Sequence, residues 1–170
     1  MITLLGRKPM ETDEQTHATS GVRFPPPFYY LIGLMLGFGI QWLLPVQLVI
    51  TAHWSLLSIA GAAAILLGLS LGAWAVITFR HAGTSPNPHK PTTAFTTAGP
   101  YRFTRNPMYL GLTLVSLGIS LLGNALWPLL AVPVVVLLVN RNVITREERY
   151  LERKFGADYL GYKQCTRRWL

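Results

Sequence analysis

Charged residues are scarce in this chain. Asp, Glu, Lys and Arg make up only 13% of the 170 residues, whereas 51% are hydrophobic. Two long segments, residues 24–79 and 106–140, contain no charged side chain of these four types. Ordinary globular domains carry about 25% charged residues, and about 20 apolar residues suffice to cross a bilayer core. The lack of charge therefore excludes an ordinary soluble domain and indicates an integral membrane protein.

Several patterns that carry chemistry are also missing. Cys165 is the only cysteine, which excludes an intrachain disulfide. The four histidines are scattered with no second ligand at metal spacing, so we expect no metal site. No Ser-His-Asp set is recognisable, and the glycines of "GLSLG" at 68–72 lie inside an apolar run. That run favours a small-xxx-small contact between helices over a dinucleotide-binding loop.

The apolar segments divide into four predicted transmembrane helices. They are expected over residues 28–44, 52–79, 108–122 and 125–139, with a tight hairpin at Gly123–Asn124. The fold class is therefore all-α, a polytopic membrane helix bundle with residues 28–170 as a single domain. Residues 1–27 are expected to form a flexible tail, in which Pro25–Pro27 holds the chain extended before the first helix.

The positions of Lys and Arg predict the orientation of this bundle. With four spans, every Lys and Arg falls on one side, which the positive-inside rule makes cytoplasmic. Both ends of the chain are then cytoplasmic. The net charge of +8 is explained by this topology and by contact with anionic membrane lipids, so we expect no nucleic-acid partner.

A cationic segment, "TAGPYRFTRNPMYLG" at 97–111, precedes the third predicted helix. Asn106 is a good N-cap and Pro107 suits the first helical position, so the helix is expected to begin there. A helix N-terminus flanked by Arg102 and Arg105 suits a carboxylate or phosphate. The alternative is that both arginines extend to lipid phosphates.

The C-terminal segment predicts an amphipathic cytoplasmic helix over residues 143–155, ended by Gly156. Glu148 falls in the middle of its apolar stripe, and Glu147 falls at the edge. A carboxylate on such a stripe needs a cation or a donor-rich ligand. A salt bridge to Arg102 or Arg105 and a ligand site both satisfy this requirement. Together the two segments describe a pocket for a zwitterionic ligand.

The paired motifs "GPYRFTRNPMYLG" and "EERYLERKFGADYLGYK" resemble the isoprenylcysteine carboxyl methyltransferase and phospholipid methyltransferase family, in particular its small bacterial members. The resemblance covers roughly residues 80–170. It implies an integral enzyme of the bacterial inner membrane that uses S-adenosylmethionine as cofactor. The acceptor would be a lipophilic small molecule or a lipid that carries a carboxylate, amine or thiol.

The resemblance also implies which residues contact the cofactor. Glu147 would bind the amino group of the methionine moiety. The other contacts would be Thr93, Ala94, Phe95, Thr96, Tyr101, Asn106, Pro107, Met108 and Tyr109. Periodicity instead favours Glu148 as the inward residue, so both glutamates stay candidates.

Three residues are candidates for the chemistry itself. Arg105 or Arg146 would orient a carboxylate acceptor, and Glu148 would act as base for an amine acceptor. Eukaryotic relatives usually have His in place of Asn106 and a substrate-side Arg in place of Val143. Two other classes of protein stay open: a non-catalytic membrane assembly or lipid-binding protein of the same fold, and a membrane reductase.

Overall fold

The computed structural model describes residues 24–48, 54–82 and 96–170. The expected tail over residues 1–23 and the candidate site residues Thr93, Ala94 and Phe95 lie outside these ranges. Within them the chain is helical and contains no β-strand, which confirms the all-α prediction.

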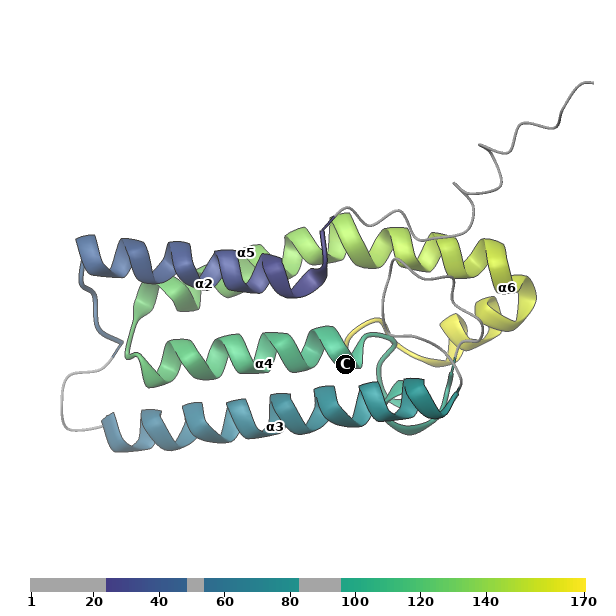
Figure 1. The fold of residues 1–170 in the computed structure, drawn as a ribbon, viewed down its shortest axis with the longest axis horizontal. Helices are drawn as coiled ribbons and strands as arrows, with labels where there is room; N and C mark the ends of the chain where they lie inside the picture. Colours follow the sequence, from purple (N-terminus) through teal and green to yellow (C-terminus); the bar gives the residue numbers. More distant parts are fainter. Residues whose placement is uncertain (1–23, 49–53, 83–95) are drawn as a thin grey trace, which may run out of the picture.

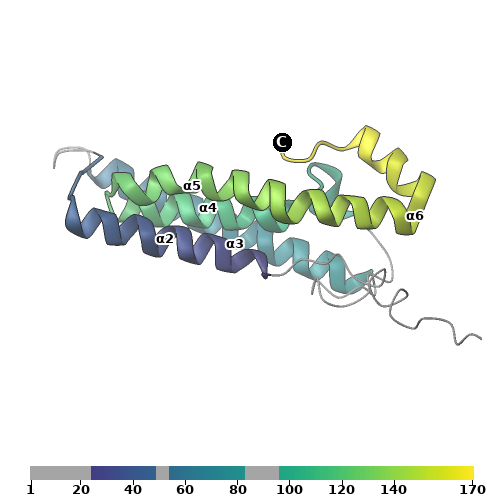
Figure 2. The ribbon, with the colours of Figure 1, turned by 90° about the horizontal axis from the view of Figure 1, so that it is seen from above.

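Four apolar helices form the body of the molecule. They are α2 (Pro26–Leu43), α3 (Trp54–His81), α4 (Pro107–Leu122) and α5 (Leu126–Val139). Figures 1 and 2 show two layers of nearly parallel axes, in which α2 lies on α5 and α4 lies on α3. All helix ends lie within two residues of the predicted ranges.

The length and composition of the helices suit a membrane. Ser55–His81 and the apolar part of a continuous helix over Leu126–Cys165 are long and apolar enough to cross a bilayer, and Pro107–Leu122 is a shorter apolar helix. Only 11% of the most apolar window of Ser55–His81 is buried, so this helix is unlike the core helix of a soluble protein. The protein is therefore membrane-associated.

Glycines bring α3 and α4 into backbone contact. A Cβ atom on Gly68 would lie 2.6 Å from the carbonyl oxygen of Gly111, and one on Gly118 would lie 2.5 Å from that of Gly61. Such distances leave no room for any side chain. Close packing of small residues is a recurrent way for helices to associate in membranes. The predicted small-xxx-small contact at "GLSLG" is confirmed.

The hairpin between α4 and α5 is also confirmed. Asn124 has a φ of 45°, which asparagine tolerates better than most residues. Its side-chain Oδ1 accepts a hydrogen bond from the backbone N–H of Leu48 at 3.0 Å. The N–H of Leu126 donates to the carbonyl of Val46 at 3.2 Å. This end of the bundle is therefore closed by hydrogen bonds from the chain that follows α2.

Two expectations about helix ends need correction. Helix α2 begins at Pro26, because proline lacks the N–H that a first helical residue leaves unpaired, so only Pro25 stays extended. The predicted helix over residues 143–155 is not separate. Helix α5 continues through a π-helical turn, η3 (Asn140–Ile144), into α6 (Thr145–Cys165). Gly156, with φ 53° and ψ −124°, is non-helical and divides α6 into two helical stretches, so the predicted end of a helix at this residue is confirmed.

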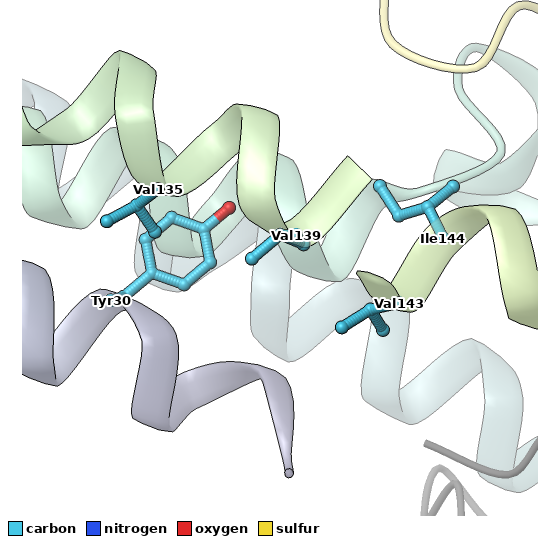
Figure 3. Close-up of a cluster of buried hydrophobic side chains, with 5 residues drawn as sticks. All are labelled: Tyr30, Val135, Val139, Val143 and Ile144. Atoms are coloured by element: carbon cyan, nitrogen blue, oxygen red, sulfur yellow. The ribbon is translucent and has the colours of Figure 1, made fainter. Parts of the chain in front are cut away.

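A small core lies where α2, α5 and η3 meet. Its buried members are Tyr30, Val135, Val139, Val143 and Ile144, as Figure 3 shows. The hydroxyl of Tyr30 also lies 2.9 Å from Oγ1 of Thr113 in α4. This core fixes the start of α6 relative to α2 and α4, and thereby positions the polar residues described next.

Candidate functional site

Polar side chains from three segments gather at the end of the bundle where α4 begins. The segments are residues 101–109, the first turns of α6, and a C-terminal strap, which we define as residues 166–170. Figure 1 places the C-terminus beside the start of α4, and Figure 2 shows α6 turning back toward the bundle. The kink at Gly156 makes this return possible, since few residues other than glycine adopt its backbone angles.

Tyr101 is anchored to α3 and α6. It belongs to the short 3-10 helix η2 (Gly99–Arg102), and its ring lies 5.4 Å from the ring of Phe79. The hydroxyl of Tyr162 donates to its carbonyl oxygen at 2.7 Å. Burial, followed by the charges of Tyr162 and Glu147, raises the pKa of the Tyr101 phenol. Tyr101 therefore stays neutral at physiological pH and can donate a hydrogen bond.

Asn106 occupies the N-cap position of α4, as predicted, but its side chain does not cap the helix. Instead its Nδ2 donates to the carbonyl oxygen of Arg168 in the strap at 2.9 Å. The expected capping bond, in which Oδ1 would accept from a backbone N–H of α4, is therefore wrong, and the side chain is bonded to the strap through Nδ2 instead. The start of α4 keeps its positive dipole end without a side-chain cap.

Glu147 pairs with a tyrosine of α4. The Tyr109 hydroxyl lies 2.8 Å from each carboxylate oxygen of Glu147 and donates to them. Burial raises the pKa of Glu147 to about 7, the hydrogen bond from Tyr109 acts against this shift, and the charge of Glu148 adds to it. Glu147 is thus a half-buried acid that changes charge near neutral pH.

Glu148 is held by two arginines. It is 5% exposed, which confirms that this residue faces inward. Its Oε1 lies 3.1 Å from Nη1 of Arg105 and accepts from Nε of Arg168 at 3.0 Å, and Oε2 accepts from Nη2 of Arg168. The hydrogen bonds to Glu148 raise the pKa of Arg168. Of the two alternatives for this carboxylate, the structure bears out the salt bridge to Arg105.

The expectation that Glu148 acts as a base stays a prediction. In this structure both of its oxygens contact guanidinium groups, which occupy positions from which a substrate proton would reach the carboxylate. Arg102, the other arginine considered as a partner, is exposed. It borders a separate open groove of about 610 Å³ with Asp158, Tyr162 and Cys165.

Arg105 has hydrogen-bonding capacity in reserve. The side chain of Arg105 is 9% exposed. The backbone N–H of Arg105 donates to the carbonyl of Arg167 at 2.9 Å. Among the described residues, neither Nε nor Nη1 donates a hydrogen bond of good geometry, although Nη1 is close to Glu148. Burial and the charge of Glu148 raise the pKa of the neighbouring Tyr159 to about 12, and Arg105 lowers it. A buried guanidinium of this kind can still bind an anion.

The remaining candidate residues lie at three places in the chain. Pro107 is buried, and Met108 is half-buried in the first turn of α4. Thr96 is half-buried, and its Oγ1 accepts from the N–H of Ala98 at 3.2 Å. Arg146 is exposed on the first turn of α6.

Residues that sequence reasoning missed complete the site. Arg168 counted only as one of the cytoplasmic charges, and Asn140 only as the end of an apolar run. In the structure Nη1 of Arg168 donates to Oδ1 of Asn140 at 3.2 Å. No local pattern could reveal this contact, because 28 residues separate its two partners.

Comparison with known proteins identifies the family. Residues 56–158 match the family model described as phospholipid methyltransferase. This chain belongs to the phospholipid methyltransferase family. The matched range contains Tyr101, Asn106, Tyr109 and both glutamates, whereas the C-terminal strap lies outside it.

An uncharacterized protein of Haemophilus influenzae is 52% identical over 65 residues, which are 37% of this chain and the whole of that protein. No solved structure matches the chain significantly. The resemblance to the phospholipid methyltransferase family drawn from the two motifs is confirmed, and the chain is a membrane-associated member of a family of methyltransferases.

Proposed function

We propose that this protein transfers a methyl group from S-adenosylmethionine to a lipophilic acceptor at the cytoplasmic surface of the membrane. Membership of the phospholipid methyltransferase family supports methyl transfer. The observation that carries the proposal is a pair of opposite charges at the polar end of the bundle. Glu147 is an acid held by Tyr109, and Arg105 is a buried guanidinium with N–H groups in reserve.

The two ends of this pair fit a zwitterion. The methionine moiety of S-adenosylmethionine carries an ammonium and a carboxylate. Glu147 would bind the ammonium, which favours the charged carboxylate that burial disfavours. Arg105 would donate to the carboxylate through Nε and Nη1. The donor and acceptor groups that the site needs are therefore present in the chain.

The walls of the cofactor site would come from the motif that opens α4. The neutral phenol of Tyr101 would donate a hydrogen bond, and Tyr109, whose hydroxyl donates to Glu147, would hold that carboxylate toward the cofactor. Asn106, Pro107 and Met108 form the adjoining turn. The family resemblance adds Thr93, Ala94, Phe95 and Thr96 as further contacts. Together these residues would bind the cofactor from the side of the cytosol.

The chain itself has a modest chemical task. When bound, S-adenosylmethionine supplies a methyl group on a sulfonium, which is already an activated leaving group. The protein must hold the acceptor in line with this methyl group and exclude water. Arg146, exposed on the first turn of α6, would orient an acidic acceptor. Glu148 would keep Arg105 in place, and it stays the candidate base for an amine acceptor.

The location of the site supports a lipophilic acceptor. The polar residues lie at the ends of α4 and α5, so a lipid in the bilayer could reach them along the apolar helices. A carboxylate, an amine and a thiol all stay candidates for the methylated group. Transfer of a labelled methyl group to lipid extracts, fatty acids, lipid amines and lipid thiols would identify the class.

The distribution of charge supports the proposed orientation. Residues 41–48 and 122–126, which form the hairpin end, carry no Lys or Arg, whereas η2 and α6 at the other end are rich in arginine. The end with the candidate site would therefore face the cytoplasm, with both chain ends on that side of a bacterial inner membrane.

Binding of S-adenosylmethionine to the detergent-purified protein, measured by calorimetry, tests the proposal. We expect binding by the wild type and a loss of at least tenfold in Glu147→Gln, because the ammonium loses its counter-charge. Glu152→Gln, a matched change on the same helix, should bind as the wild type does. Absence of binding by a folded wild type at millimolar cofactor would refute the proposal. It would favour a non-catalytic assembly or lipid-binding protein, and binding of a nicotinamide cofactor instead would favour a reductase.

A further inference from the structure

The C-terminal strap contacts every residue of the turn that precedes α4. Oγ1 of Thr104 and Nδ2 of Asn106 donate to the carbonyl oxygen of Arg168, at 3.1 and 2.9 Å. The N–H of Arg105 donates to the carbonyl of Arg167 at 2.9 Å. Donor groups of three consecutive residues thus bind two neighbouring carbonyl oxygens of the strap. Such a set of bonds fixes the turn in one conformation.

The side chain of Arg168 continues the connection to two other elements. It donates to both carboxylate oxygens of Glu148 in α6 and to Oδ1 of Asn140 in η3. A planar guanidinium with donors in a fixed fork suits this task, since it can bind a carboxylate on one side and an amide on the other. Through its carbonyl and its side chain, Arg168 therefore links the start of α4 to η3 and α6.

The strap is also anchored by an apolar contact. Trp169 packs against the core cluster of Tyr30, Val135, Val139, Val143 and Ile144, on which Tyr109 packs as well. Arg168 thus lies between a polar anchor on the turn and an apolar anchor on the core.

We infer that Arg168 is a positioning residue that holds the first turn of α4 against α6 and so brings Tyr109 within hydrogen-bonding distance of Glu147. This inference rests on the proposed function only for its effect on cofactor affinity. Its effect on the Tyr109–Glu147 contact is independent of any ligand. Arg168 contacts Asn106 and Glu148. Tyr109 follows Asn106 by three residues in α4, and Glu147 directly precedes Glu148 in α6.

Removal of this side chain should leave the protein folded. Arg105 lies 3.1 Å from Glu148, and its side chain is 9% exposed, whereas that of Arg168 is 32% exposed. In Arg168→Gln the buried carboxylate therefore keeps one cation. The substitution loosens the link between elements without leaving Glu148 alone among apolar groups.

A double-mutant cycle on unfolding of the full-length protein in detergent tests the inference directly. Tyr109→Phe should increase the unfolding equilibrium constant at least about tenfold in the wild-type background and less than threefold in Arg168→Gln. Arg167→Gln, an exposed neighbour in the strap, is the matched background in which the full effect of Tyr109→Phe should return. Equal effects of Tyr109→Phe in all three backgrounds would overturn the inference. Arg168→Lys, which keeps the charge but not the fork, should give an intermediate effect and serves if Arg168→Gln does not fold.

A second measurement separates this inference from the proposed function. Arg168→Gln should lower the affinity for S-adenosylmethionine about tenfold. Arg168→Lys should recover part of this affinity, and Arg167→Gln should bind the cofactor as the wild type does. An affinity unchanged in Arg168→Gln would overturn the inference even if the wild type binds the cofactor. If the wild type binds no cofactor, the proposed function fails, whereas coupling in the cycle would still uphold the role of Arg168.

Discussion

The Tyr109 hydroxyl lies 2.8 Å from both carboxylate oxygens of Glu147, and this contact joins the first turn of α4 to the first turn of α6. It unites the two sequence motifs, which are 38 residues apart in the chain at this point. The two neighbouring glutamates have different partners. A phenol holds Glu147, and two arginines hold Glu148. Glu147 can respond to pH and ligands, whereas Glu148 holds Arg105 and Arg168 in place.

Glu147→Gln should make the protein more stable at alkaline pH. The folded carboxyl has a pKa of about 7, above its ordinary value of 4.5, so folding takes up a proton at pH values between these two. Stability from this group is therefore present below about pH 4.5 and is lost as the pH rises to about 7. Gln mimics the neutral acid and avoids this loss. Melting temperatures of the two proteins should coincide near pH 4.5 and diverge toward pH 8, whereas exposed Asp158→Asn should leave the profile of the wild type unchanged.

Tyr109→Phe should raise the pH at which Glu147 ionises. The phenol donates to the carboxylate and lowers the pKa of Glu147, while burial holds that pKa up, so removal of the donor leaves burial unopposed. The loss of one charge-assisted hydrogen bond should also reduce stability by about 1.5–3 kcal/mol. The pH dependence of melting, with Tyr29→Phe as control, measures both effects. A midpoint that moves to lower pH would contradict the contact described here.

Glu148→Gln should destabilise the protein strongly. It leaves the buried guanidinium of Arg105 without a counter-charge, and breaking a buried pair in this way costs about 3–5 kcal/mol. Glu152→Gln removes a more exposed pair with Lys163, for which we expect a loss of less than about 1 kcal/mol. Thermal unfolding compares the two variants. Equal losses would mean that Glu148 is hydrated.

Gly68→Ala should weaken the packing of α3 on α4. A Cβ atom there would lie 2.6 Å from the carbonyl oxygen of Gly111, so one helix would have to move, at a cost of about 1–3 kcal/mol. A Cβ atom on Gly72, one turn further along the same helix, meets nothing within 4 Å. Gly72→Ala should therefore be neutral or stabilise by up to about 1 kcal/mol through its helix propensity. Chemical unfolding of both variants in detergent is the measurement, and similar losses would contradict the glycine contact.

The sequence by itself determined the features that depend on local pattern. Uncharged apolar runs located the four helices of the bundle, and Gly123–Asn124 located the hairpin, because chain turns need residues that tolerate a positive φ. The helical period placed Glu148 on the buried face, since side chains 100° apart divide a helix into faces. Paired motifs at a characteristic spacing indicated the methyltransferase family, which the family match confirms.

Only the tertiary structure decided which side chains meet. The partners of Asn106 and Glu148 in the strap are 62 and 20 residues away in sequence, and no periodicity within one segment extends that far. The backbone at Gly156 turns α6 back toward α4, and this turn brings Arg168 to Glu148. Local rules predicted that a helix ends at Gly156, as it does, but they left the direction of the following residues open. Hydrogen bonds between distant segments depend on that direction, and packing against the core sets it.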